Sequence, residues 1–305
     1  MMNTQAIEQN KKKRMGSLKR EKYFTIIFGH LLLVVLAVIW LYPILWIILQ
    51  SFRVEYNDQN QLVGIVVSHY FPKGLGVQNY VNLFNNSTFV FGRWWLNTLF
   101  VSFFTFIIST LFVLSVAYVM SKLKFKSRKV FLSTAIILGL FPGFMSMIAI
   151  YYILKAMSLT GSLPALILVY SAGAGLGFYV GKGFFDIIPN SLIESARLDG
   201  CTNAGIFAKI ILPMSKPIII YTAITTFMGP WMDFIFAKTI IGEKNRANLT
   251  VAFGLYSMIY GEQSDSNLFT TFAAGSVLVA LPIVILFISM QKYYVEGVTA
   301  GSVKG

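Results

Sequence analysis

Long apolar runs separated by short polar stretches dominate this chain. A helix needs about 20 mostly apolar residues to cross a bilayer, and six segments meet that length. Because backbone groups in lipid must bond to one another, each run is predicted to be a helix. The six segments cover residues 24–50, 95–120, 130–156, 164–184, 215–241 and 269–291. The pattern therefore predicts an all-α integral membrane protein with six transmembrane helices.

The ends of the first and last apolar segments predict the domain boundaries. The first run is longer than the roughly 7–15 apolar residues of a cleaved signal peptide, so we expect it to remain as a span. With no internal repeat or soluble domain visible, we expect a basic tail over 1–23, one transmembrane domain over 24–291 and a short tail over 292–305. Three prolines lie within spans, where kinks are tolerated: Pro43, Pro142 and Pro282.

Basic residues are distributed unevenly between the loops, and this predicts the orientation. Seven Lys and Arg residues lie in the tail over 1–23 and five in the linker over 121–129, whereas the loops over 51–94 and 242–268 together carry five. The positive-inside rule therefore places both termini in the cytoplasm, together with a polar segment over 189–213. The two long loops are expected to face outward.

Composition agrees with a membrane protein and excludes several other classes. Hydrophobic residues make up 56% of the 305 and charged residues only 12%, against roughly 25% charged in soluble domains. The net charge is +13, but the cations flank apolar runs, which favours membrane topology over nucleic-acid binding. The single cysteine, Cys201, excludes an internal disulfide and a multi-cysteine metal site. No catalytic set or metal-ligand spacing stands out, so we expect no enzyme and no metal or cofactor in this chain.

The fourth span contains a GKG sequence that is not a nucleotide site. The P-loop pattern G-x-x-x-x-G-K-[ST] fails here at Leu176 and at Gly183. The spacing of Gly173, Gly177 and Gly181 instead makes a smooth helix face, and small faces let membrane helices approach closely. We expect this face to pack against a neighbouring helix. Any ATP that the protein uses must then be hydrolysed by another subunit.

A carboxylate lies within the fifth span, where burial in lipid is costly. Asp233 follows Gly229 and Pro230, which could break the helix, and Trp231 could offer a flat face to a sugar ring. One interpretation is that Trp231 and Asp233 line a solute path, because intramembrane carboxylates usually face a cavity or a partner. The alternative is a structural hydrogen bond to a neighbouring helix. The residues alone leave both open.

The polar segment over 189–213 is predicted to be a helix, a turn and a second helix outside the membrane. Ser191 and Glu194 have the spacing of a capping box at the start of the first helix. Gly200 permits a tight turn, and Pro213 is expected to end the second helix. Either of two residues can cap that helix: Thr202 or Asn203.

Apolar residues in this segment form one stripe at helical spacing: Ile193, Ala196, Ala204, Phe207 and Ile211. Arg197, Asp199 and Lys209 occupy other faces. The stripe either packs on the chain's own helices or meets another protein. The spacing by itself favours neither.

The segment resembles the EAA loop of permease subunits in ATP-binding cassette importers. The resemblance lies in Glu194-Ser195-Ala196, in Gly200 and in Ile211-Leu212-Pro213, with Ser195 standing where the family usually has Ala. The stretches FPGFMSMIAIYYILKAMSL and NLTVAFGLYSMIYGE are similar to carbohydrate permeases, and the ending YYVEGVTAGSVKG is similar to the maltose branch.

The resemblance implies a type I importer permease fold with a cytoplasmic coupling helix that docks in a cleft of an ATPase subunit. Glu194 would make a polar contact there, Ala196 and Gly200 would supply a small surface and a bend, and further residues would lie at the rim or link to the spans. The implied coupling residues are Glu194, Ser195, Ala196, Arg197, Asp199, Gly200, Leu212 and Pro213. The tail would also reach the ATPase through Gly301, Ser302, Val303, Lys304 and Gly305.

The resemblance also implies partners and a cargo. A second homologous permease, two ATPases that bind ATP and Mg, and an extracellular solute-binding protein would complete a bacterial cell-membrane importer, with lipid around it and no nucleic acid. The cargo would be an oligosaccharide of the maltose or maltodextrin type, with raffinose or a galacto-oligosaccharide as alternatives. A secondary transporter or channel is the rival of another class, but it would more often show inverted repeats or several intramembrane charges. A membrane enzyme would need the catalytic set that is missing.

Overall fold

The structure, a computed structural model, is built almost entirely from helices, as the apolar pattern predicts. Among the described residues there are no β-strands, only two isolated bridges, Arg53 with Leu75 and Tyr56 with Leu62, in the loop after the first helix. The residues described are 2–66, 69–141, 143–174 and 177–299.

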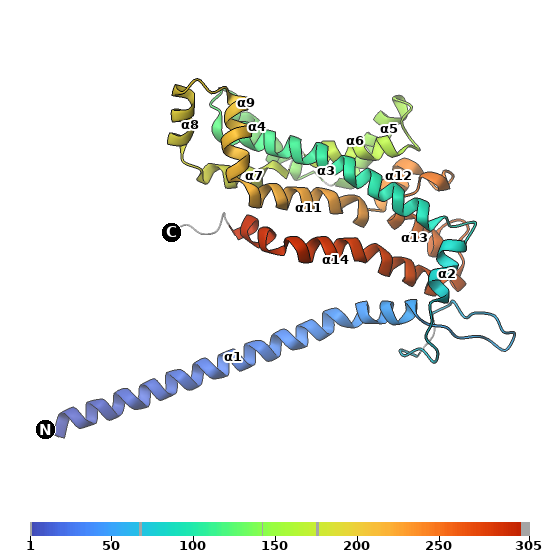
Figure 1. Ribbon diagram of the computed structural model, residues 1–305, viewed down its shortest axis with the longest axis horizontal. Helices are drawn as coiled ribbons and strands as arrows, with labels where there is room; N and C mark the ends of the chain where they lie inside the picture. Colours follow the sequence, from blue (N-terminus) through green and yellow to red (C-terminus); the bar gives the residue numbers. More distant parts are fainter. Residues whose placement is uncertain (1, 67–68, 142, 175–176, 300–305) are drawn as a thin grey trace.

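Long helices give the molecule its shape. Figure 1 shows α3 (Phe91–Lys122), α11 (Lys216–Met232) and α14 (Phe269–Thr299) lying side by side, while α1 (Met2–Ser51) contacts α14 near its C-terminal end and diverges toward its N-terminus. In the described part of the chain, α1, α3 and α14 are long and apolar enough to cross a membrane, and three bent helix pairs would raise the number to six.

Two predicted spans are not straight helices. The third is divided into α4 (Arg128–Gly139) and α5 (Gly143–Ala156), whose axes differ by 100°. The fourth is divided into α6 (Leu163–Ala174) and α7 (Phe178–Ile187), which differ by 42°. Both divisions lie at glycines, which weaken a helix. The kink expected at Pro142 lies outside the described residues.

The fifth predicted span is also wrong as a single helix. α11 ends at Met232, Asp233 has an extended backbone, and α12 (Ile235–Ile241) begins two residues later. The break is therefore at Asp233 and not at Gly229 or Pro230, because α11 continues through both. The other two prolines are accommodated inside long helices as expected: Pro43 in α1 and Pro282 in α14.

Two hydrophobic cores lie along α3. One gathers around Trp94 and Trp231 on the half of α3 near α12, and the other gathers around Ala117 and Phe185 where α3 meets α7. Each of these four side chains is at most 2% exposed. Because α3 contributes to both cores, it connects the two ends of the bundle.

The loop over 242–268, expected to be an outward loop, contains a buried helix. α13 (Val251–Tyr260) packs against α3 and α14, and Val251 and Phe253 are fully buried. With ten residues, α13 is shorter than the roughly 20 that a transmembrane span needs, so the apolar pattern did not predict it. Short 3-10 turns flank it at Arg246–Asn248 and Ser266–Leu268.

The loop that follows α1 is anchored by buried polar groups. Arg53 is fully buried and donates from Nη2 to the carbonyl oxygen of His69 at 2.8 Å. Glu55 lies 3.0 Å from Nε2 of His69 and accepts from the backbone N–H of Lys73 at 2.7 Å. Burial by itself raises the pKa of Glu55. The hydrogen bonds and the positive charge of Arg53 lower it by more than burial raises it, so the net pKa lies below the ordinary value. The short helix α2 (Gln78–Asn85) packs against α14 beside this cluster.

Candidate functional site

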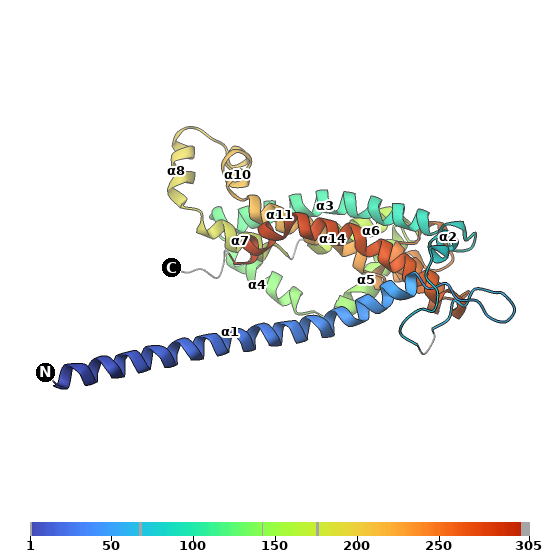
Figure 2. The ribbon, with the colours of Figure 1, turned by 60° about the horizontal axis from the view of Figure 1, so that its bottom comes forward.

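The polar segment over 189–213 forms a helical hairpin that projects from one end of the bundle. It contains α8 (Asn190–Leu198), α9 (Asn203–Ile206), the π-helical turn η2 (Phe207–Ile211) and α10 (Leu212–Met214). Figures 1 and 2 place it at the end of the bundle toward which the N-terminus of α1 and the C-terminal end of α14 point.

The predicted turn and second cap of this hairpin are confirmed. Gly200 has φ +79°, a left-handed conformation that glycine adopts without strain. Thr202 caps α9, because its Oγ1 accepts from the backbone N–H of Gly205 at 3.1 Å. Tyr118 of α3 donates from its hydroxyl to the carbonyl oxygen of Asn203 at 3.1 Å and ties α9 to the bundle.

One detail of the predicted hairpin is wrong. No side chain caps α8, which begins directly after Pro189, so Ser191 lies inside its first turn and forms no capping box with the exposed Glu194. Pro213 lies at the end of the second helix as predicted, because that helix runs from Asn203 to Met214 and ends one residue after it. The chain bends by 89° after α10, at Ser215, where α11 begins.

The apolar stripe of the segment packs on the chain's own helices. Ile193 and Ile211 are buried in the second core, and Phe207 lies with its ring centroid 5.0 Å from that of Tyr118. Ala204 is exposed instead, and Ile206 is fully buried in its place. The prediction failed there because the turn before Thr202 rotates the second helix relative to the first. The hairpin is thus held as a rigid unit.

The outer surface of the hairpin carries most of the predicted coupling residues. Leu212 is partly buried, and the following are exposed: Glu194, Ser195, Arg197, Asp199, Gly200 and Pro213. Ala196 departs from the expectation, because it is 6% exposed and packs inward, leaving little surface for a partner. Leu198, which the sequence reasoning did not single out, is 89% exposed. Its position between Arg197 and Asp199, off the apolar stripe, was the signal that could have identified it.

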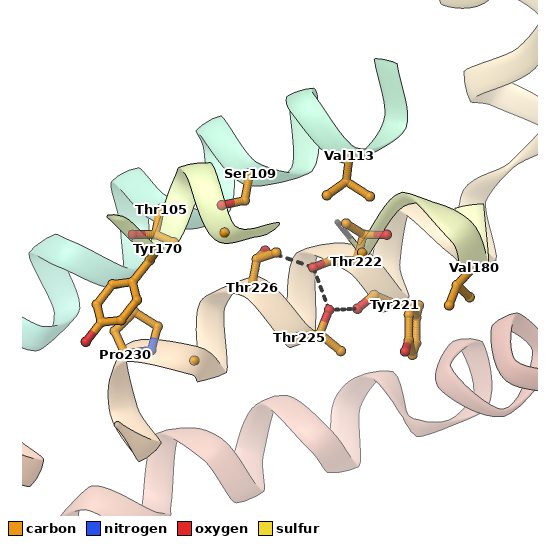
Figure 3. A pocket seen from close by; sticks show the side chains of 13 residues that line it. Thr105, Ser109, Val113, Tyr170, Val180, Tyr221, Thr222, Thr225, Thr226 and Pro230 are labelled. Atoms are coloured by element: carbon orange, nitrogen blue, oxygen red, sulfur yellow. Dashed lines mark hydrogen bonds between the residues drawn. The ribbon is translucent and has the colours of Figure 1, made fainter. Parts of the chain in front are cut away.

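A cavity of about 400 Å³ lies within the bundle between α3, α6, α7 and α11 (Figure 3). Its walls contain seven hydroxyl side chains and no charged one: Thr105, Ser109, Tyr170, Tyr221, Thr222, Thr225 and Thr226. Thr222 and Thr226 donate to backbone carbonyls of α11. The hydroxyls of Thr105 and Ser109 are buried without a hydrogen-bond partner among the described residues.

The glycine face of the fourth span behaves differently at its two ends. A Cβ on Gly181 would lie 3.1 Å from that of Ala117, which confirms close packing there. A Cβ on Gly173 or Gly177 would meet nothing within 4 Å, and both residues line the cavity, so the packing prediction is wrong for them. Gly229 of α11 adds a third open position. The cavity exists largely because these positions have no side chains.

Trp231 and Asp233, the two residues predicted to line a solute path, lie next to the cavity but do not line it. Trp231 is 2% exposed and packs edge-on against Trp95, with ring centroids 5.4 Å apart. Asp233 accepts from the Tyr170 hydroxyl at 2.6 Å and from the backbone N–H groups at the start of α12, including that of Ile235 at 3.2 Å. These contacts favour the structural alternative for Asp233. Tyr170 connects it to the cavity, because Tyr170 itself lines the wall.

Two further predictions concern the C-terminal tail and metal binding. The tail residues Gly301, Ser302, Val303, Lys304 and Gly305 lie outside the described residues. Within the described part of the chain, no group of three or more His, Cys, Asp or Glu side chains could hold a metal ion. The polar side chains that line the cavity carry hydroxyl groups.

Comparison with known proteins points to membrane transport. Residues 114–299 match the family described as binding-protein-dependent transport system inner membrane components. The chain is 35% identical to a galactooligosaccharides transport system permease protein of Bacillus subtilis strain 168, over 95% of the chain and 100% of the relative. It is 30% identical to a maltodextrin transport system permease protein of Streptococcus pneumoniae, over 95% and 99%.

Solved structures share the fold. A chain of a bacterial ABC transporter for import of the acidic polysaccharide alginate superposes with a TM-score of 0.73 at 21% identity, covering 88% of this chain and 97% of the other. The alginate transporter in complex with an alginate pentasaccharide-bound periplasmic protein superposes with a TM-score of 0.60 at 16% identity, over 90% and 97%.

Proposed function

The chain belongs to the family of binding-protein-dependent transport system inner membrane components, and we propose that it is a permease subunit of an ATP-driven importer for neutral oligosaccharides. The observation that carries this proposal is the uncharged, hydroxyl-lined cavity inside the bundle. Neutral oligosaccharides present many hydroxyls and no charge, so a wall of Thr, Ser and Tyr side chains suits them. The family relationship supports a transport role and not an enzymatic one.

The hairpin over 189–213 serves as the coupling element in this proposal. Its exposed polar face, with Glu194 and Arg197, would dock on an ATPase subunit, and Leu198 would insert into an apolar hollow there. Ile193 and Ile211 bury the opposite face, so a push on the hairpin would pass to the bundle without being lost in a flexible loop. The bend at Ser215, which is fully buried, would deliver that push to α11, whose side chains line the cavity.

The partners follow from the family. A second permease would complete the pore, and two ATPases would bind ATP and Mg outside this chain. An extracellular solute-binding protein would deliver the sugar to the end of the bundle opposite the hairpin. The alginate transporter, solved in complex with a periplasmic protein, supports such a partner. The bent helix pairs would count as single spans, giving six in a bacterial cell membrane with both termini and the hairpin in the cytoplasm.

Two sugar classes compete as cargo. The galactooligosaccharide relative shares 35% identity and the maltodextrin relatives 30% and 31%, so we place galacto-oligosaccharides first and maltodextrins second. Both are neutral, and the cavity wall favours either over an acidic polysaccharide. Uptake of radiolabelled galacto-oligosaccharide, challenged by excess maltodextrin or raffinose, tests the choice. Competition only by a charged polysaccharide would contradict the proposal.

A filled cavity provides a direct test of its role. Gly173→Leu would project a side chain into open space in the wall without a backbone clash. We expect sugar uptake to fall about tenfold, which corresponds to a barrier higher by ~1.4 kcal/mol, while the amount of protein in the membrane stays the same. Gly183→Leu is the matched control, because it lies on the adjoining helix α7, is equally open and does not line the cavity. Normal uptake in the Gly173 variant would remove the cavity from the path.

A further inference from the structure

A second cavity, of about 430 Å³, lies at the base of the hairpin and is lined by basic residues. It is bordered by the end of α3, the linker to α4 and the side of α8 that carries Glu194 and Arg197. The charged side chains in its wall are Lys122, Lys124, Arg128, Arg197 and Glu194. Three of these cations, Lys122, Lys124 and Arg128, belong neither to the transport path nor to the proposed ATPase contact.

The positive charge in this cavity is only partly balanced by the protein, because the four cations share the wall with a single carboxylate, that of Glu194. In the part of the chain that the structure describes, none of the four cations lies within 4 Å of a carboxylate. Lys122 is only 9% exposed and donates to neutral groups, the carbonyl oxygen of Ile188 at 2.6 Å and Oδ1 of Asn190 at 3.2 Å. Four like charges around one cavity repel one another, so binding of an anion there is favourable.

A neighbouring carboxylate outside the wall is already engaged. Asp186 of α7 pairs with Lys182 at 2.6 Å and accepts from the hydroxyl of Ser121 at 2.6 Å. Each of its two oxygens therefore has a partner other than the four cations. An external anion with several oxygens would suit the site, because Arg donates in a planar fork and Lys binds phosphate as a point charge.

An apolar surface adjoins the cavity and identifies the kind of anion. Directly after Arg128, α4 exposes Val130 at 66% and Phe131 at 56%, and none of its described residues is buried. Leu123 and Phe125 form an apolar part of the wall itself. A soluble anion would gain nothing from these side chains, whereas an acyl chain would cover them.

We propose that this cavity binds the phosphate of an anionic phospholipid whose acyl chains lie along α4. The site is at the basic end of the bundle, and basic pockets between helices on the cytoplasmic side bind phospholipid headgroups. The bound phosphate would join the α3–α4 linker to α8 and so brace the base of the hairpin. The proposal uses the predicted orientation of the chain but does not depend on which sugar is carried.

The test uses the full chain, purified with its co-purifying subunits and placed in phosphatidylcholine nanodiscs with a photoreactive phosphatidylglycerol. Peptide mapping should locate the cross-link between residues 121 and 131 or between 190 and 203. In the double variant Lys124→Gln/Arg128→Gln we expect cross-linking to fall about tenfold, equivalent to about 1.4 kcal/mol. Neither residue belongs to the proposed ATPase contact.

A matched control separates a specific site from general attraction. Lys126→Gln/Lys129→Gln removes the same charge from the same linker, but neither residue lines the cavity, so cross-linking should be unchanged. Lys124→Arg/Arg128→Lys keeps the charges and should retain it, which would exclude misfolding as the cause. Equal loss in both Gln double variants would overturn the proposal.

Competition identifies the source of the phosphate. Excess unlabelled phosphatidylglycerol should displace the photoreactive lipid, while phosphatidylcholine and inorganic phosphate should not. Displacement by inorganic phosphate would overturn the proposal in favour of a soluble anion. Since binding is measured without transport, a failed lipid test would leave the sugar-uptake result untouched, and the reverse also holds.

Discussion

At the scale of single residues, the positions without side chains matter as much as those with them. Gly173, Gly177 and Gly229 leave space that becomes the hydroxyl-lined cavity, whereas Gly254 allows contact. A Cβ on Gly254 would lie 2.1 Å from Cε3 of Trp94, which is fully buried. Glycine therefore leaves room for a cavity in one part of the bundle and allows close packing in another.

Gly254→Ala is expected to destabilise the protein because the new Cβ would collide with the Trp94 ring. Overpacking of this kind costs about 1–3 kcal/mol. Thermal unfolding of the purified protein in detergent should show a lower midpoint. Gly183→Ala meets nothing within 4 Å and serves as the reference. Equal midpoints for the two variants would show that Trp94 moves aside at no cost.

The Glu55 cluster predicts a pH-dependent loop. The folded-state pKa of Glu55 lies below its ordinary value, so its stabilising contribution is present above the unfolded pKa of about 4.3 and is lost as pH falls through the folded value. Limited proteolysis of the loop over 52–77 should therefore quicken as the pH drops below about 4. Glu55→Gln should be cleaved faster at neutral pH and lose much of this acid response. If proteolysis of the Glu55→Gln variant still quickened at acid pH as in the unmodified protein, the pH dependence would belong to other titratable groups.

At the scale of elements, the hairpin combines a buried face with a surface made for contact. Ile193, Ile206 and Ile211 hold it to α3 and α7, and the turn at Gly200 sets the angle between its helices. The exposed tip of α8 is Leu198. Leu198 is 89% exposed, so its apolar side chain is available for a partner to cover.

Leu198→Ala is expected to weaken binding of the ATPase without lowering the amount of permease. Loss of a well-packed apolar anchor costs about 2 kcal/mol or more in binding, roughly a 30-fold change. Co-purification of the ATPase with tagged permease measures it. Leu192→Ala, on the same helix and 42% exposed, provides the control. Equal retention of the ATPase by the two variants would argue against an anchoring role.

At the scale of the whole molecule, the exposed apolar surface requires a bilayer. The apolar part of α1 from Tyr23 to Ser51 has an 18-residue window with no buried residue, and it contacts α14 mainly near its C-terminal end. The hairpin and the N-terminus of α1 lie toward one end of the bundle, and the loop after α1 lies at the other. This division agrees with the basic residues of the tail and linker lying on one side.

Cys201 reports the orientation without any engineering, since it is the only cysteine and is exposed at the tip of the hairpin. A membrane-impermeant maleimide should label it in inside-out vesicles but not in intact cells. Bound ATPase should slow the labelling, since the turn lies beside Leu198. Labelling from the outside would invert the topology and contradict the coupling role.

The sequence determined the features that depend on local chemistry. Run length and polarity predicted the helices over 24–50, 95–120 and 269–291, because a helix in lipid satisfies its backbone within its own segment. The turn at Gly200 was equally local, whereas the sequence left the cap of the second helix open between Thr202 and Asn203 and the structure assigns it to Thr202. The resemblance of the hairpin motif to the permease family is consistent with the match over 114–299.

Only the tertiary structure decided which remote residues meet. Tyr170 and Asp233 are 63 positions apart, yet they are joined by a hydrogen bond that favours the structural interpretation of Asp233 over the path interpretation. Gly173 and Gly181 belong to the same spacing, but one opens a cavity and the other packs on Ala117. The short α13 became buried because α3 and α14 cover it. Packing between distant segments depends on shape in three dimensions, which periodicity along the chain does not specify.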